Sequence, residues 1–364
     1  MNILFYLGHP AQFHFSKNII SRLQKDGHTV LVLIKTKDVL EDLVKKSGFS
    51  YVNIQNEVRK NSRYSIAIAS LKRTFSVLKL AIKCKCDVLI GTDASIAQVG
   101  YILGRPSFTT LEDDFEIIPK LAKVTYPFSR KIIVPKVCKV GKWEKKKVGY
   151  DGYMKLAYLH PNYFKKDACV IKKYGLCDRY VLVRLAKLTA HHDVGIKGLN
   201  VDLVLKLINL IKSFGCGVYL SSEDNIDERL GDFVLKIDSV DMHQILAHSA
   251  MLISDSQSMS VESAMLGVPS LRFSDFSGKI SVLEELEHKY ELTRGIKTSE
   301  PHELILRVKE YFTQEDSADL FNERHLKMLN DKIDVTAFFV WFIENYPESA
   351  KIMKENPDYQ YNFR

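Results

Sequence analysis

The chain has 364 residues, enough for about two domains, and its composition of 46% hydrophobic and 26% charged residues excludes a disordered or collagen-like protein. The net charge of +8 is divided unevenly along the sequence. Residues 1–175 hold 31 basic and 14 acidic residues and carry +17, whereas residues 176–364 hold 21 and 30 and carry −9. A uniform soluble enzyme is not expected to divide its charge in this way.

Neither a signal peptide nor a membrane-spanning helix is expected. The first apolar run stops at Gly8, and no stretch of about 18 apolar residues is free of charge. The six cysteines form no Cys-x-x-Cys pair, which favours reduced thiols over a zinc site or a disulfide framework. We therefore expect a cytoplasmic protein.

The first half of the sequence alternates between short apolar runs and segments with apolar residues at helical spacing. This alternation is typical of a parallel sheet wrapped by helices. Strands are predicted at residues 3–7, 29–34, 87–91 and 107–111, and helices at residues 14–25, 39–46 and 65–83.

The second half repeats the same alternation after a polar segment at residues 165–178. Strands are predicted at residues 180–185, 217–220, 251–254 and 269–273, and helices at residues 199–214, 242–248 and 258–266. We therefore predict an α/β protein with two Rossmann-like doubly wound domains that face each other across a cleft. The predicted parts are a basic first domain at 1–170, a second domain at 171–330 and a segment at 331–364 whose apolar helix packs back on the first domain.

The segment after the first predicted strand, Gly8-His9-Pro10-Ala11-Gln12-Phe13-His14, is a candidate site. A loop before a helix presents backbone N–H groups that suit a phosphate or a sugar. Either His9 or His14 could act as a general base near neutral pH, although a lone histidine in such a position is more often structural than catalytic. The segment is not a Gly-x-Gly-x-x-Gly motif, which argues against a nicotinamide cofactor.

A second candidate site begins at the end of the strand predicted at 251–254. Small polar residues at a helix start favour a diphosphate there, because the helix dipole attracts anions. Glu262 lies one turn into this helix. The alternative is plain N-capping with a solvated Glu262. The candidate ligand-binding residues are Ser256, Gln257, Ser258, Met259 and Glu262.

Two further groups of polar residues follow predicted strands. Arg184 interrupts an apolar strand, and His191, His192 and Asp193 follow it, in an arrangement that suits a phosphate or sugar hydroxyl better than a metal ion. In the first domain, Asp93 and Glu112 follow strands, where a carboxylate could bind a sugar hydroxyl or move a proton. The alternatives are helix capping by Asp93 and a solvated acidic loop around Glu112.

Five segments together resemble one family over nearly the whole chain. It is domain-of-unknown-function family 354 (DUF354), which is grouped with GT-B glycosyltransferases and nucleotide-sugar 2-epimerases. The resemblance implies a GT-B fold. The matching segments are LGHPAQFHF (7–15), IGTDASIAQVGYILGRPSF (90–108), YDGYMKLAYLHP (150–161), VLVRLAKLTAHHDVGIKG (181–198) and SDSQSMSVESAMLGVPSLRF (254–273).

The resemblance to GT-B transferases implies roles for several residues. Glu262 lies five residues before Gly267 in the Gly-x-Pro turn, as does the glutamate that holds the ribose hydroxyls in those enzymes. Residues 256–260 then correspond to the diphosphate-binding loop. The base of the peptidoglycan N-acetylglucosaminyltransferase falls near Gln12, so His14 or His9 would take its place.

The resemblance to the 2-epimerases points to other residues. Asp93 and Glu112 take the places of their catalytic carboxylates, and His191 or His192 corresponds loosely to their acid–base histidine. This chain has His9-Pro10-Ala11 where the epimerases have Arg-Pro-Glu, which favours the transferase.

The first hypothesis is therefore a metal-independent GT-B glycosyltransferase without a cofactor, which uses a nucleotide sugar, a UDP-sugar, as donor. Its acceptor would be a glycan or a polyprenyl-diphosphate-linked sugar in surface polysaccharide or glycoconjugate biosynthesis, and Arg184 would stabilise the departing diphosphate. The alternatives are a UDP-GlcNAc 2-epimerase-like enzyme and a non-catalytic sugar-nucleotide-binding protein. The sequence has no nucleic-acid-binding motif, so no nucleic acid is expected.

The basic first domain suits an anionic partner such as the inner face of the plasma membrane, which it would contact peripherally. The alternative is a solvated basic surface. The basic residues proposed for this contact are Lys72, Arg73, Lys79 and Lys83 on one helix, and Lys142, Lys145, Lys146 and Lys147 around Trp143.

Overall fold

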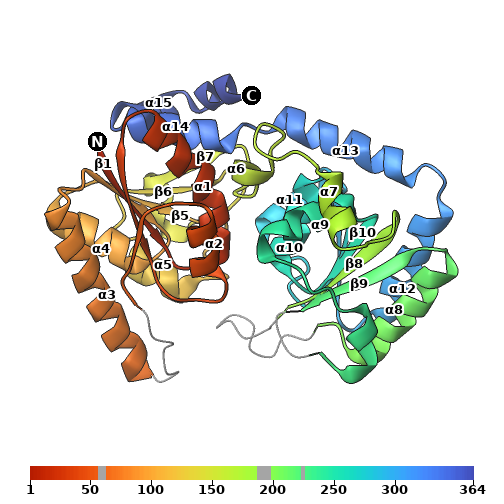
Figure 1. The fold of residues 1–364 in the computed structure, drawn as a ribbon. Helices are drawn as coiled ribbons and strands as arrows, with labels where there is room; N and C mark the ends of the chain where they lie inside the picture. The colour runs from red at the N-terminus through yellow and green to blue at the C-terminus, as the bar shows by residue number, and fades with distance from the viewer. Residues whose placement is uncertain (56–62, 187–197, 223–225) are drawn as a thin grey trace. The chain divides into compact units, whose positions relative to one another are not determined.

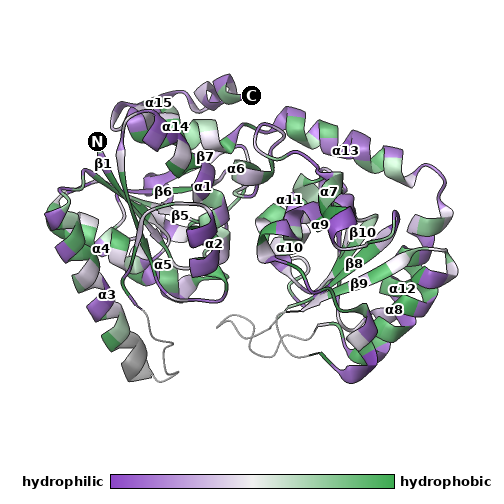
Figure 2. Cartoon of the chain, viewed as in Figure 1, coloured by the Kyte–Doolittle hydropathy of each residue, from purple (hydrophilic) through white to green (hydrophobic). Residues whose placement is uncertain are grey.

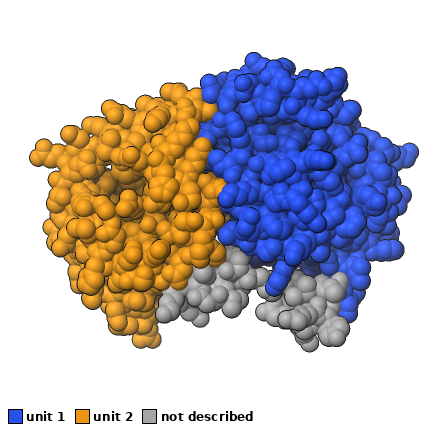
Figure 3. Space-filling view, turned by 180° about the vertical axis from the view of Figure 1, so that it is seen from behind, with its two compact units in different colours: residues 1–158, 332–364 blue, residues 159–331 orange. Residues whose placement is uncertain are grey.

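The computed structural model describes residues 1–55, 63–186, 198–222 and 226–364. Its chain divides into two compact units (Figure 3), of which unit 1 comprises residues 1–158 and 332–364 and unit 2 comprises residues 159–331. Each unit is built around a parallel sheet with helices on both faces (Figure 1), so the predicted α/β class with two doubly wound sheets is confirmed.

The sheet of unit 1 has seven parallel strands in the order β3-β2-β1-β4-β5-β6-β7. The chain changes direction across the sheet at β1, so the carboxyl ends of β1 and β4 flank a topological switch point. The strands are β1 (Asn2–Leu7), β2 (Thr29–Ile34), β3 (Tyr51–Asn53), β4 (Val88–Gly91), β5 (Ser107–Thr110), β6 (Lys131–Pro135) and β7 (Lys147–Tyr150). The α-helices are α1 (Pro10–Lys25), α2 (Leu40–Lys46), α3 (Arg63–Lys83), α4 (Ala94–Leu103), α5 (Pro119–Thr125), α6 (Leu156–Leu159), which runs across the unit boundary, α14 (Val335–Glu344) and α15 (Glu348–Glu355).

Alternating side chains of these strands pack against helices on the two faces of the sheet. One core cluster joins Leu4 and Leu89 of the sheet to Val77 of α3 and Ile96 of α4. Helices α3 and α4 therefore cover the same face of the sheet.

The C-terminal segment returns to unit 1 through aromatic contacts. Phe339 of α14 lies edge-on to Phe15 of α1, with ring centres 5.0 Å apart, and to Tyr150 of β7 at 5.4 Å. Lys332 also contacts Asp151 at 2.7 Å. α14 is strongly apolar but has only 10 residues. Nowhere in the described parts of the chain does a helix combine the length and apolarity needed to cross a bilayer.

The sheet of unit 2 has five parallel strands in the order β12-β11-β10-β8-β9. Leu203 and Leu207 of α8 pack with Leu304 of α12 against one face of this sheet. The strands are β8 (Tyr180–Leu185), β9 (Gly217–Ser222), β10 (Met251–Ser254), β11 (Ser270–Phe273) and β12 (Thr293–Ile296). The α-helices are α7 (Ala168–Lys173), α8 (Val201–Ser213), α9 (Met242–His248), α10 (Gln257–Met265), α11 (Ser281–His288), α12 (Pro301–Thr313) and α13 (Ser317–Asp331).

The boundary between the units lies after Tyr158 rather than at the predicted residue 170. Residues 159–170 belong to unit 2 because Gln244 of α9 holds this segment. Its side chain accepts a hydrogen bond from the Asp167 N–H at 2.9 Å and donates one to the Lys165 carbonyl at 2.9 Å. The polar composition of this segment suggested a boundary between domains. Its hydrogen-bond partner, Gln244, is 77 residues away in sequence from Asp167 and 79 from Lys165, so no local pattern in the sequence indicated these contacts.

Helix α1 begins at Pro10, four residues before the predicted start. Proline suits the first turn of a helix because the N–H groups of that turn have no partner within the helix, so the absence of an N–H group on proline loses no hydrogen bond. The side chain of His9 caps the helix. Residues 10–14 are therefore helical rather than part of a loop.

The packing of α14 predicts a large loss of stability for Phe339→Ala. Phe339 is fully buried, so its removal should lower the free energy of unfolding of unit 1 by about 3–5 kcal/mol. The matched control is Phe75→Ala, which removes an exposed phenylalanine of the same unit and should change stability by less than about 0.5 kcal/mol. Both tryptophans, Trp143 and Trp341, lie in unit 1, so tryptophan fluorescence during urea unfolding reports this unit. Equal losses for the two variants would contradict the described packing of α14.

Candidate functional site

The carboxyl edge of the unit 2 sheet brings two predicted site segments together. Arg184 near the end of β8 lies in register with Ser254 at the end of β10, although 70 residues separate them. Arg184 donates a hydrogen bond from Nη1 to Ser221 Oγ of β9 at 2.6 Å. Arg184 thus lies on the strand next to β10, which leads into α10, and its guanidinium group is held by β9 on the other side of β8.

The start of α10 is capped by its serines. Ser254 Oγ accepts a hydrogen bond from the Ser256 N–H at 2.8 Å, and Ser256 Oγ accepts one from the Met259 N–H at 3.4 Å. The Gln257 side chain donates to Ser274 Oγ at 3.0 Å. The N-capping that the sequence offered as the alternative to anion binding is therefore present in the structure. Ser258, in the first turn of α10, is half-buried.

Glu262 is buried rather than solvated, which differs from that alternative. Its carboxylate Oε1 lies 3.4 Å from Nε2 of His243 on α9, which is also buried. A carboxylate with two oxygens can accept hydrogen bonds from both hydroxyls of a ribose ring. His243 carried no motif in the sequence, because its position on a short apolar helix is also that of an ordinary core residue.

Asp255, between β10 and α10, is a buried carboxylate whose role the sequence did not indicate. Oδ1 accepts a hydrogen bond from the Ala186 N–H at 2.7 Å, and Oδ2 accepts one from the Leu199 N–H at 3.3 Å. Burial raises the pKa of Asp255, while these two N–H donors and the nearby Arg184 oppose the shift. Gly198 is required beside it, since a Cβ atom there would lie 2.3 Å from Oδ2.

Another charged group that the sequence analysis missed is Arg272 of β11. Its side chain is completely buried, 3.9 Å from the Glu287 carboxylate, and none of its three nitrogens has a hydrogen-bond partner among the described residues. Burial lowers its pKa, and Glu287 opposes that shift. Gly295 leaves the space it needs, because a Cβ atom there would lie 2.6 Å from Nη2.

The predicted residues His191, His192 and Asp193 lie outside the described residues. Among the residues that the structure does describe, no group of three or more His, Cys, Asp or Glu side chains is arranged to hold a metal ion.

In unit 1, the two histidines after β1 occupy different environments. His9 is exposed, and its Nδ1 accepts a hydrogen bond from the Ala11 N–H at 3.2 Å. His14 is half-buried on α1, with its ring 5.3 Å from that of Tyr158. The Nδ1 lone pair of His9 is thus engaged in capping α1.

Asp93 follows β4 and caps α4. Its Oδ1 accepts hydrogen bonds from the Ser95 N–H at 3.0 Å and from Arg73 Nε at 3.1 Å. Burial and the nearby Asp93 carboxylate raise the pKa of Tyr6 on β1. The cap that was the alternative to a catalytic role is therefore present, and Arg73 adds an ion pair to it.

Glu112 follows β5, the strand next to β4, and is not solvated. Its Oε1 accepts a hydrogen bond from the Met154 N–H at 2.7 Å, and its Oε2 pairs with Lys155 Nζ at 2.5 Å. Both side chains of this ion pair are nearly buried. The carboxyl ends of neighbouring strands thus bring Asp93 and Glu112 to one edge of the sheet, where each is held by a cation.

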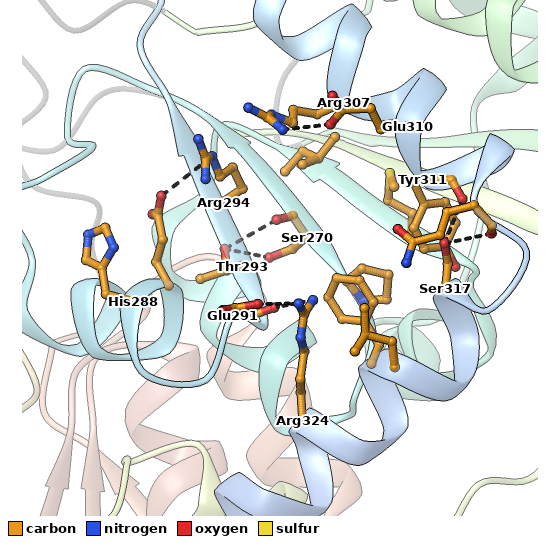
Figure 4. Close-up of a pocket in the computed structure, with 17 residues that line it drawn as sticks. Ser270, His288, Glu291, Thr293, Arg294, Arg307, Glu310, Tyr311, Ser317 and Arg324 are labelled. Carbon is orange, nitrogen blue, oxygen red and sulfur yellow. Dashed lines mark hydrogen bonds and ion pairs between the residues drawn. The ribbon is translucent and has the colours of Figure 1, made fainter.

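A pocket of about 400 Å³ lies at the opposite edge of the unit 2 sheet. Figure 4 shows its lining residues, which include Ser270 and Thr293 at the amino ends of β11 and β12. Its arginines are paired within the wall, as Arg307 is with Glu310 at 2.7 Å. This pocket is therefore separate from the carboxyl edge that carries Glu262.

Comparison with solved structures shows the fold. The chain is similar to a putative UDP-N-acetylglucosamine 2-epimerase from Listeria monocytogenes, with a TM-score of 0.69 and 12% identity over 95% of this chain and 96% of that one. It is also similar to S. aureus MnaA in a co-structure with UDP, with a TM-score of 0.67 and 13% identity over 96% and 97% of the two chains. The spinosyn forosaminyltransferase SpnP gives a TM-score of 0.63 and 13% identity over 95% of this chain and all of that one. Both groups anticipated from the resemblance, glycosyltransferases and 2-epimerases, thus share this two-sheet GT-B fold.

Comparison with curated proteins finds no match. The family described as "Protein of unknown function (DUF354)" matches residues 1–339, which is nearly the whole chain. The chain belongs to this DUF354 family.

Proposed function

We propose that the chain is a GT-B glycosyltransferase that transfers a sugar from a UDP-sugar to a glycan or a polyprenyl-diphosphate-linked acceptor, in the synthesis of a surface polysaccharide or glycoconjugate. The observation that carries this proposal is the buried Glu262 carboxylate beside His243, one turn into the helix that follows β10. The structural neighbours support the nucleotide, because one of them is MnaA in a co-structure with UDP.

The proposed donor site lies in unit 2, and we assign separate roles in it to Glu262, the start of α10 and Arg184. Glu262 accepts hydrogen bonds from the two ribose hydroxyls, and the start of α10 faces the diphosphate. Arg184, fixed by Ser221, neutralises the charge that develops on the leaving diphosphate. This charge stabilisation requires no metal ion.

The proposed transfer is a displacement at the anomeric carbon. The acceptor hydroxyl loses its proton to a base and bonds to this carbon, while the bond from the carbon to the β-phosphate oxygen breaks and UDP leaves. We assign the base to His14 rather than His9, because the capping bond from Ala11 occupies the Nδ1 lone pair of His9.

A 2-epimerase is the second candidate, and it is supported by neighbours that include UDP-GlcNAc 2-epimerases. Asp93 and Glu112 would move its protons. In this structure Arg73 and Lys155 already pair with the two carboxylates, which fits structural roles at least as well. The third candidate, a non-catalytic protein, would bind the sugar nucleotide without turnover.

The products formed from UDP-GlcNAc separate the three candidates. The transferase is expected to release UDP only when an acceptor, such as a short polyprenyl-diphosphate-linked sugar, is present. An epimerase would instead form the 2-epimer of UDP-GlcNAc without any acceptor, and NMR spectroscopy would detect this product. Binding of several UDP-sugars without turnover under either condition would support the non-catalytic protein.

Glu262→Gln is expected to weaken binding of UDP by about tenfold or more, because it replaces charge-assisted hydrogen bonds to ribose by weaker ones. Isothermal titration calorimetry measures this affinity without turnover. The matched control is Glu315→Gln, an exposed glutamate of the same unit, which should leave the affinity unchanged. Unchanged affinity in Glu262→Gln would contradict the donor site.

His14→Gln is expected to lower kcat by about 10²- to 10⁴-fold, because it removes the proposed base, while the KM for the donor changes little. His9→Asn is the matched variant, since asparagine also caps a helix and should keep most of the activity. If the two variants show the reverse order of activity, the assignment of the base to His14 is wrong.

A further inference from the structure

The outward face of α3 in unit 1 carries four large apolar side chains in contact with solvent. Ile68, Leu71, Phe75 and Ile82 are 54%, 71%, 70% and 57% exposed. Their spacing of three, four and seven residues places them on one face of the helix. The opposite face, with Val77 and Ala81, is buried in the core, so these four residues are not needed to attach the helix to the sheet.

The apolar surface extends onto the neighbouring helix. Thr74 of α3 donates a hydrogen bond to Gln98 of α4 at 3.2 Å, so the two helices lie side by side. One turn further along α4, Tyr101 and Ile102 are 68% and 61% exposed. Figure 2 shows hydrophobic residues recurring along α3. Exposed apolar residues gathered in this way mark an interaction surface, whereas scattered ones do not.

Lysines accompany the apolar residues of α3. Lys72, Lys79 and Lys83 are exposed, and α3 and α4 contain no acidic residue. Arg73, which the sequence placed in the same basic group, turns inward to Asp93 at 3.1 Å and is nearly buried. The surface formed by these three lysines and the exposed apolar residues of α3 and α4 is called the α3–α4 surface below.

In the other predicted basic group, Trp143 and Lys146 make contacts within unit 1. Trp143 packs against Phe115 and Tyr126, each with ring centres 5.5 Å away. Lys146 Nζ donates hydrogen bonds to the Tyr126 carbonyl at 3.0 Å and to the Pro127 carbonyl at 2.6 Å. These contacts distinguish this cluster from the α3–α4 surface.

We propose that the α3–α4 surface docks the chain on a membrane that contains anionic lipids. Large apolar side chains can enter the boundary between head groups and acyl chains, while lysines beside them reach the lipid phosphates. This combination fits a bilayer better than a second copy of the chain. A two-fold contact would bring the lysines of each copy together, with no acidic residue on either helix to offset them.

This proposal does not rest on the proposed function, so its test uses binding rather than activity. The full chain is mixed with vesicles of phosphatidylcholine alone or with added phosphatidylglycerol, and bound protein is measured by flotation. We expect binding to the anionic vesicles that weakens as salt is raised. Equal binding to both kinds of vesicle, or to neither, would overturn the proposal.

Two sets of variants test the two components of the α3–α4 surface. Leu71→Ser with Phe75→Ser, and separately Lys72→Gln with Lys79→Gln and Lys83→Gln, should each lower partitioning onto anionic vesicles by about tenfold or more. The matched control is Leu306→Ser with Leu326→Ser, which changes two residues of unit 2 that are about half exposed and should leave partitioning unchanged. Unchanged thermal unfolding shows that the exposed positions were altered without loss of fold.

Two results would contradict this assignment. One is undiminished partitioning in both test variants. The other is a self-associated wild-type chain that becomes monomeric in the Leu71→Ser, Phe75→Ser variant by analytical ultracentrifugation, which would assign the α3–α4 surface to a second copy.

Discussion

All strands of each sheet run in the same direction, and this constraint places the candidate residues. Each crossover helix returns the chain to the same starting edge, so the carboxyl ends of all strands lie at the other edge. Arg184 and Ser254 are 70 residues apart and lie in register on adjacent strands. Asp93 and Glu112 come together in the same way after β4 and β5. Polar groups that are distant in sequence therefore meet without any direct pairing between them.

The carboxylates at these edges differ in what surrounds them. Asp93 and Glu112 each pair with a cation, and Asp255 accepts two backbone N–H groups. Such contacts satisfy buried carboxylates and fix local structure. Glu262 instead lies 3.4 Å from an imidazole, a longer and weaker contact than the 2.7 Å bond that Asp255 makes to Ala186. A histidine, rather than a lysine, an arginine or backbone N–H groups, is thus the neighbour of the Glu262 carboxylate.

Local patterns in the sequence were sufficient for most of the fold but not for the environment of the site. Strand β10 and helix α9 were predicted at their observed bounds, because apolar runs and helical spacing are local signals. The contacts of Gln244 that move the unit boundary depend on partners far away in sequence. For the same reason the spacing of Glu262 to Gly267 could suggest a role, but not its burial beside His243.

The basic character of the first half illustrates how charge and burial must be considered together. Counting lysines and arginines could not separate Arg73, which completes an ion pair inside unit 1, from Lys72 beside it, which is exposed. The structure separates the two residues by their burial, and it also shows that apolar residues beside Lys72 are exposed. An apolar side chain in contact with water contributes little to folding, so Leu71 and Phe75 do not stabilise α3 through burial. Their presence on the same helical face as the lysines is better explained by what that face contacts than by what holds unit 1 together.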